Sequence, residues 1–179
     1  LQHEALHILS QLDKKPIIAI DLDYTLNSLY CTDRRNSSVR LLSLYPEARE
    51  VLEWCLDNNI ILTVCSRCPD QPIVQEILTA FEMWDWFFLP QVFPQRKVNH
   101  FCNLVEQGKL EFTDFLFFDD DAANISLCSQ MGVSSYQVRK STGISWSSFV
   151  KGLTLYRNNE QVRLTLKSWL NSSRSQQNS

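Results

Sequence analysis

The sequence has no large net charge, no long apolar run and only three histidines. Its 17 basic and 20 acidic residues leave a formal net charge of −3, which gives no overall field to draw the chain to a nucleic-acid backbone or an anionic membrane. No apolar stretch approaches the ~20 residues of a membrane-spanning helix. We therefore expect neither nucleic acid nor a membrane as a partner, and any recognition of phosphate has to be local.

The start of the sequence also lacks the charged segment and apolar core of a secretory signal. Several of the six cysteines lie in apolar stretches, such as Cys65 at the end of Ile61–Cys65, where a reduced thiol behaves as a small hydrophobic group. The sequence therefore predicts a reducing compartment, with the cytoplasm favoured and the nucleus as the alternative.

The three histidines include one motif match that we discount. His3 and His7 flank Glu4 in the spacing of the zinc motif His-Glu-x-x-His. Such a site needs a third ligand and a cleft, whereas His100 is the only other histidine and the motif lies at a terminus that is prone to fraying. We predict that the match is a coincidence.

What the sequence does have is the composition of a folded globular domain, with 44% hydrophobic residues, ten Phe and five Trp. Short apolar, β-branched runs alternate along the chain with segments of helical period. Strands are expected at 17–20, 60–65, 115–118 and 133–138, with a less certain extended piece at 87–89. Helices are expected at 4–12, 46–58, 71–81, 97–107, 122–131, 145–156 and 160–170. This alternation predicts an α/β fold, a mostly parallel sheet covered by helices on both faces.

The length of 179 residues fits one domain, which we place at residues 1–170 with an N-terminal helix within 1–15. The polar insert at 31–44 is expected to be a flap or minimal cap over a site, with a plain surface loop as the alternative. Residues 171–179 contain only Asn, Ser, Gln and Arg, and this composition predicts a disordered tail. A monomer is favoured.

Polar side chains follow three of the expected strands. Asp21 follows the strand expected at 17–20, and Ser66 and Arg67 follow the one at 60–65. The run of three Asp at 119–121 follows the strand expected at 115–118. Because ligands of open α/β sheets bind beyond the carboxyl ends of the strands, these groups should converge. The alternative is that these acids only cap helices or form turns.

Two carboxylates, Asp21 and Asp23, lie two residues apart where a buried strand gives way to a loop. Like charges this close repel strongly unless a cation lies between them or one is protonated. Hard oxygen ligands without a nearby histidine favour Mg²⁺. Asp119 and Asp120, which arrive from another strand end, would complete such a metal site.

These residues resemble the motifs of the haloacid dehalogenase superfamily of phosphatases. Asp21-x-Asp23-x-Thr25 is similar to its first motif, and Ser66, Lys97 and the pair Asp119-Asp120 fit the second, third and fourth in order. Within the superfamily the sequence most resembles the magnesium-dependent phosphatase-1 type, on the segments 21–26, 45–47, 66–67, 97–101, 117–120 and 124–125. The resemblance runs from about Pro16 to Leu153 and implies a three-layer α/β/α, Rossmann-like fold with a minimal cap.

The resemblance implies a role for each matched residue. Asp21 would be the nucleophile that forms an aspartyl phosphate, and Asp23 the general acid and base. The ligands of Mg²⁺ would be Asp21, the backbone carbonyl of Asp23, and Asp120, with Asp119 in support.

Ser66, Arg67 and Lys97 would bind the phosphate, and Lys97 would also place a positive charge beside the nucleophile. The alternatives are that Ser66 caps a helix and Lys97 is a solvated lysine, and for Thr25 we favour a structural role in the loop.

The predicted function is therefore a magnesium-dependent acid phosphatase with a protein-tyrosine-phosphatase-like activity. Its substrate would be a phosphorylated small molecule or a phosphoprotein, with phosphotyrosine-like aryl phosphates and sugar phosphates both open. The alternative is a catalytically silent module that serves in binding or as a scaffold.

Overall fold

The computed structural model describes residues 1–28 and 43–177. Its strands are β1 (Ile17–Ile20), β2 (Leu62–Ser66), β3 (Gln91–Val92), β4 (Phe115–Asp119) and β5 (Ser134–Gln137). Its helices are α1 (Gln2–Ser10), α2 (Ala48–Asp57), α3 (Gln71–Ala80), α4 (Lys97–Gly108), α5 (Ala122–Gln130) and α6 (Trp146–Gln177), with 3-10 turns η2 (Trp84–Trp86) and η3 (Phe112–Asp114). The flap predicted at 31–44 lies outside the described residues except for its last two.

The strands form one parallel sheet in the order β3-β2-β1-β4-β5. Strand β1 is central because its run of four apolar residues can be buried on both faces, as a parallel sheet requires. Ile20 pairs with Val64 of β2 and with Phe118 of β4. The carboxyl ends of these three strands therefore lie at the same edge of the sheet.

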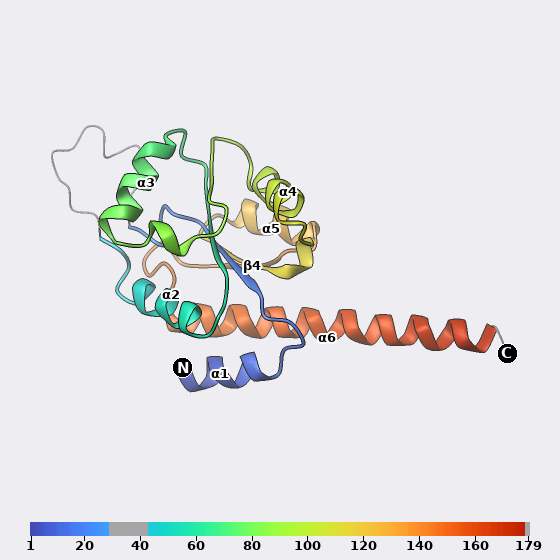
Figure 1. Cartoon of the computed structure of the whole chain (residues 1–179). Helices are drawn as coiled ribbons and strands as arrows, with labels where there is room; N and C mark the ends of the chain where they lie inside the picture. Colours follow the sequence, from blue (N-terminus) through green and yellow to red (C-terminus); the bar gives the residue numbers. More distant parts are fainter. Residues whose placement is uncertain (29–42, 178–179) are drawn as a thin grey trace.

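Alternate side chains of β1 enter two different hydrophobic cores. Ile18 and Ile20 pack in a cluster with residues of α1, α2, α3 and α6. Ile17 and Ala19 pack in a second cluster with residues of α4 and α5. Helices thus cover both faces of the sheet (Figure 1), and the predicted three-layer α/β/α, Rossmann-like fold is confirmed.

Strand β3 differs from the extended piece that was predicted at 87–89. Pairing in the structure begins at Gln91, and Phe87 makes only an isolated bridge to Leu62. Leu89 has a left-handed backbone with φ of 44°, and Pro90, which follows it, has no N–H to donate to a neighbouring strand. The strand therefore starts only after the proline.

Helix α6 replaces the two separate helices predicted at 145–156 and 160–170, and it runs on to Gln177. No Pro or Gly lies in 157–159, so nothing breaks the helical hydrogen bonds there. Residues 171–177, the described part of the tail that the sequence predicts to be disordered at 171–179, are helical in the structure. Ser172 and Ser173 donate to the carbonyls of Ser168 and Trp169 one turn earlier, at 3.1 and 3.0 Å. The polar composition correctly indicates exposure in this segment, but it does not prevent helix.

Within residues 1–28 and 43–177, no helix combines the length and the apolar character needed to cross a bilayer.

The oxidation state of the cysteines differs along the chain. Free thiols are found at Cys55, Cys65, Cys102 and Cys128, whereas Cys68 is disulfide-bonded. At Cys68 the structure differs from the reduced state predicted for the cysteines.

Candidate active site

Polar residues from several chain segments line one cavity of about 370 Å³ at the carboxyl edge of the sheet. Six of the seven residues that the sequence predicted for the site line this cavity: Asp21, Asp23, Arg67, Lys97, Asp119 and Asp120. The convergence follows from the parallel register, because residues that come just after paired strands share an edge.

Asp21 is the first residue after β1, and a tight turn fixes its side chain. Its backbone N–H donates to the carbonyl of Phe118 at 3.0 Å, which keeps it in line with β4. The Thr25 hydroxyl donates to Oδ2 of Asp21 at 3.1 Å. Thr25 therefore does more than tie the loop, because it orients the carboxylate itself.

Tyr24 gives this turn its shape. Its φ of 58° places it in the left-handed region, which costs a residue with a side chain roughly 1–3 kcal/mol and recurs at functional sites. The conformation lets the N–H groups of Leu26 and Asn27 both donate to the carbonyl of Leu22, each at 3.0 Å. The chain turns back at once, so Asp21, Asp23 and Tyr24 all line the cavity.

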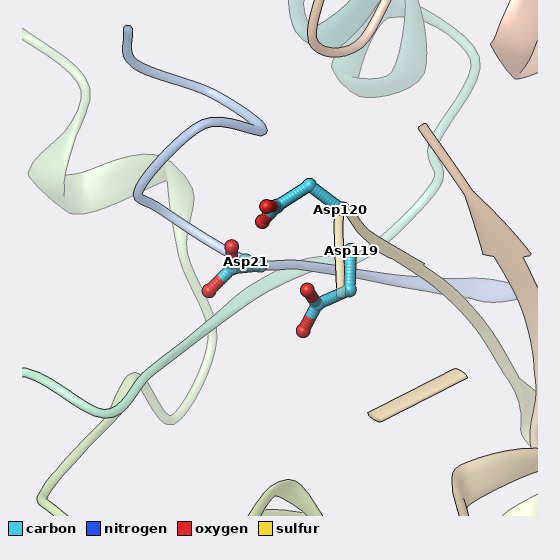
Figure 2. A group of neighbouring side chains, drawn as sticks. All are labelled: Asp21, Asp119 and Asp120. Carbon is cyan, nitrogen blue, oxygen red and sulfur yellow. The ribbon is translucent and has the colours of Figure 1, made fainter. Parts of the chain in front are cut away.

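Asp21, Asp119 and Asp120 form a cluster in which one carboxylate oxygen of each lies within 4.8 Å of the others. Figure 2 shows the three side chains directed toward a common space. In the described part of the chain, no other group of three or more His, Cys, Asp or Glu side chains has this geometry, and His3 and His7 belong to none. Three carboxylates without a histidine match the oxygen ligands that Mg²⁺ prefers.

Lys97 lies under this cluster as the first residue of α4. It is only 2% exposed, and its Nζ lies 2.6 Å from Oδ1 of Asp21 and 3.5 Å from Oδ2 of Asp119. It also donates to the carbonyl of Cys65 at the end of β2. Burial lowers the pKa of Lys97, but the two carboxylates outweigh it and raise this pKa above its ordinary value. Lys97 is therefore a buried, permanently charged residue and not a solvated lysine.

Burial disfavours the charged form of all three carboxylates in the cluster. Burial raises the pKa of Asp21 to about 6, even though Lys97 opposes the rise. Burial and the charge of Asp21 likewise raise the pKa of Asp119 to about 6, and burial and Asp119 raise that of Asp120. Each shift means that the ionised form is disfavoured, and a bound divalent cation would relieve this.

The three consecutive acids after β4 have different tasks. Asp121 is the N-cap of α5, since its Oδ1 accepts from the N–H groups of Ala123 and Asn124 at 2.7 and 3.2 Å. Asp119 accepts from the N–H of Asp121 at 2.8 Å and from the amide of Asn124 at 3.0 Å. The helix-cap alternative is therefore right for Asp121, although Asp121 also lines the cavity together with Asp119 and Asp120.

Ser66 is the predicted residue that does not line the cavity. It is 1% exposed, and its Oγ accepts from the N–H of Cys68 at 3.2 Å. It does not cap a helix either, because the N-cap of α3 is Asp70, whose carboxylate accepts from Ile73 at 3.2 Å. Arg67 is exposed at the mouth of the cavity.

The cavity also contains residues to which the sequence assigned no role, chiefly Tyr24, Asn124 and Lys140. The Nζ of Lys140 lies 3.6 Å from Oδ2 of Asp120 and 5.1 Å from the centre of the Tyr24 ring. Lys140 comes just after β5, so the rule that groups after strand ends converge could have found it. Tyr24 and Asn124 lie in the segments 21–26 and 124–125 that carry the family resemblance, but neither is charged and neither ends a strand, so the strand-end rule gives them no role.

Comparison with known proteins gives a family for this arrangement. The model of the acid phosphatase family matches residues 14–159. Human magnesium-dependent phosphatase 1 is 27% identical over an alignment of 158 residues, which covers 79% of this chain and 87% of the human protein.

Solved structures share the fold at low sequence identity. The N-terminal part of a Bacteroides fragilis protein, containing a phosphatase domain complexed with Mg, superimposes with a TM-score of 0.65 at 16% identity, over 84% of this chain and 43% of that one. The cobalt-bound deoxy-D-mannose-octulosonate 8-phosphate phosphatase of Haemophilus influenzae has a TM-score of 0.58 at 15% identity, over 89% of this chain and 99% of that one. A hydrolase of the haloacid dehalogenase superfamily from Ehrlichia chaffeensis has a TM-score of 0.59 at 11% identity, over 83% and 99%.

Proposed function

Since the chain belongs to the acid phosphatase family, of the haloacid dehalogenase type, we propose that it is a magnesium-dependent phosphomonoesterase that acts through an aspartyl phosphate on Asp21. The observation that carries the proposal is the buried Asp21 carboxylate, held 2.6 Å from Lys97 and clustered with Asp119 and Asp120. A nucleophile, a fixed cation and a set of metal ligands thus meet in one cavity.

The residues that would hold Mg²⁺ are Asp21, Asp120 and the backbone carbonyl of Asp23. Asp119 suits a supporting place, because hydrogen bonds from the N–H of Asp121 and the amide of Asn124 already engage its two oxygens. When bound, the ion supplies positive charge that offsets the phosphoryl oxygens. The human relative is named for its magnesium dependence, and the Bacteroides structure was solved with Mg.

In the first step an oxygen of Asp21 attacks phosphorus in line with the leaving group. The bond between phosphorus and the leaving oxygen breaks, and Asp23 gives that oxygen its proton. Lys97 keeps Asp21 oriented and adds positive charge beside the transferred group. In the second step Asp23 takes a proton from a water that attacks phosphorus, the bond between phosphorus and the Asp21 oxygen breaks, and inorganic phosphate leaves with the Asp21 carboxylate restored.

Arg67 at the cavity mouth suits contact with the substrate beyond its phosphate. Ser66 is buried under the cavity floor, so its part in phosphate binding would act through the backbone of the 66–68 segment. We favour phosphotyrosine-like aryl phosphates, phosphoprotein side chains or sugar phosphates as substrates.

Hydrolysis of an aryl phosphate with and without Mg²⁺ tests the proposal. Asp21→Asn removes the nucleophile, and its kcat should fall by at least about 10³-fold. Asp57→Asn is the matched control, because Asp57 is exposed at the end of α2. Beryllium fluoride should bind the unmodified protein in the presence of Mg²⁺ and should not bind the Asp21→Asn variant.

Equal rates for the Asp21→Asn variant and the unmodified protein would exclude this mechanism. If neither hydrolyses any phosphomonoester and neither binds beryllium fluoride, the chain is the catalytically silent binding module instead.

A further inference from the structure

The C-terminal part of α6 carries an apolar face that is not covered by the described part of the chain. Val162, Leu166, Trp169 and Leu170 are 67%, 56%, 64% and 44% exposed. Since successive residues of an α-helix are about 100° apart around its axis, these four side chains lie within an arc of about 100° on one side of the helix. Exposed apolar side chains that gather on one face mark a surface for an interaction.

This face begins where α6 leaves the body of the protein. Glu160 is the last buried residue of the helix, and its carboxylate accepts from the N–H groups of Asp13 and Lys14 at 2.8 and 3.0 Å. Asp13 and Lys14 come just before β1, so α6 passes the amino edge of the sheet at this point. Figure 1 shows the rest of α6 projecting beyond the other elements.

The charge of the projecting segment is opposite to that of the rest of the chain. All 20 acidic residues lie at or before Glu160, whereas 161–177 carries Arg163, Lys167 and Arg174. These three side chains share an arc of about 40°, which starts beside the apolar arc. An apolar stripe flanked by a purely basic one is the pattern of helices that lie in the interface of a membrane.

We propose that residues 161–177 of α6 bind the surface of an anionic lipid bilayer, with the apolar stripe in the interface and the basic stripe against the headgroups. The Trp169 ring suits this place, since it is apolar with one polar N–H. The net charge of −3 for the whole chain gives no such attraction, and the binding is a property of this segment alone.

A second copy of the chain fits this face less well. If two copies of the helix packed antiparallel through their apolar stripes, the basic stripes beside them would approach each other without any acidic partner in 161–177. A flat anionic surface offers opposite charge along the whole stripe, and it needs no matching groove.

Binding in this way leaves the active site open. The cavity lies at the carboxyl edge of the sheet, and the projecting part of α6 lies beyond the amino edge. Soluble phosphomonoesters would therefore reach the cavity equally well when the protein is on a vesicle.

Cosedimentation with vesicles tests the inference, using phosphatidylcholine with or without phosphatidylserine. The full chain should bind the anionic vesicles and lose most of this binding at high salt. The double variant Lys167→Gln/Arg174→Gln should bind roughly thirtyfold more weakly. Leu166→Gln/Trp169→Gln should lose binding as well.

Leu164→Gln is the matched control, because Leu164 is 44% exposed but lies on the opposite side of the helix. It should bind as the unmodified chain does, and circular dichroism would show that every variant is folded. Three results would overturn the inference. They are absence of binding to anionic vesicles, binding that survives Leu166→Gln/Trp169→Gln, and a dimer in ultracentrifugation that this variant dissociates.

Discussion

At the scale of single residues, Lys97 is the cation on which two buried carboxylates depend. Its Nζ lies 2.6 Å from Asp21 and 3.5 Å from Asp119, and all three side chains are nearly inaccessible to water. A buried charge that loses its partner keeps its cost of desolvation. The residue therefore matters both for the stability of the fold and for the proposed chemistry.

Lys97→Met should lower the free energy of unfolding at pH 7.5, without metal, by about 3–5 kcal/mol, because two carboxylates lose their counter-charge. It should also lower kcat/KM by at least about 10²-fold. Urea unfolding and hydrolysis of an aryl phosphate measure the two effects. Lys151→Met, at an exposed position of α6, is the control. A loss of stability equal to that of the control would contradict the buried ion pair.

His100 is a second buried residue with a predictable effect, here on the pH dependence of stability. Its Nε2 lies 3.0 Å from the carbonyl of Phe93, and its Nδ1 has no hydrogen-bond partner among the described residues. Burial, together with the charge of Lys97, lowers the pKa of His100 from 6.5 to about 4. The unfolded chain therefore takes up this proton more readily than the folded one.

The contribution of His100 to stability should be complete above pH 6.5 and should be lost as the pH falls toward 4. The loss amounts to about 3 kcal/mol. In urea unfolding between pH 7 and 4, His100→Gln should lack this component, while His3→Gln, at an exposed position, should keep it. Parallel curves for His100→Gln and the unmodified protein would rule out the shifted pKa.

At the scale of elements, the close approach of α6 to β4 depends on Gly152. A Cβ at this position would lie 2.5 Å from Cζ of Phe118, a side chain with no exposed surface. Gly152→Ala should therefore lower the free energy of unfolding by about 1–2 kcal/mol, because overpacking outweighs the gain in helix propensity. Asn158→Ala, exposed on the same helix, should not. A stabilised Gly152→Ala variant would show that the helix can shift at no cost.

The elements also show what the sequence could predict. Strands β1, β2 and β4 were predicted because each is a short apolar run bounded by polar residues, and Asp21, Ser66 and Asp119 follow from where those runs end. The position of β3 and the continuity of α6 could not be predicted in this way. The first depends on the backbone around Leu89 and Pro90, and the second on the absence of any break in a polar segment. Local sequence patterns predict well where a strand or helix is interrupted by Pro, Gly or polar residues. They do not predict whether a polar, exposed segment continues a helix.

At the scale of the whole molecule, the cavity links metal binding to global stability. Mg²⁺ that binds only the folded state should stabilise it by about 2.7 kcal/mol at a hundredfold excess over Kd. For a chain of this size the corresponding rise in Tm is roughly 5–10 °C. Asp120→Asn should lose most of this rise, because Asp120 belongs to the carboxylate cluster.

Differential scanning calorimetry with Mg²⁺ or with a chelator measures this rise, and Asp57→Asn again serves as the control. A rise in Tm that persists in Asp120→Asn would place the ion elsewhere.

The central position of β1 in the sheet affects how the chain acquires its site during synthesis. Strand β1 pairs with β2 through Ile18 and Leu62, but its other partner is β4, where Phe115 lies about a hundred residues after Ile17, and such distant pairing is slow. Asp21 cannot meet Asp119 and Asp120 before then, and α6, which covers one face of the sheet, emerges later still. A nascent chain therefore carries Asp21, the proposed nucleophile, well before the proposed site can form, and apolar strands exposed in that interval are prone to aggregation.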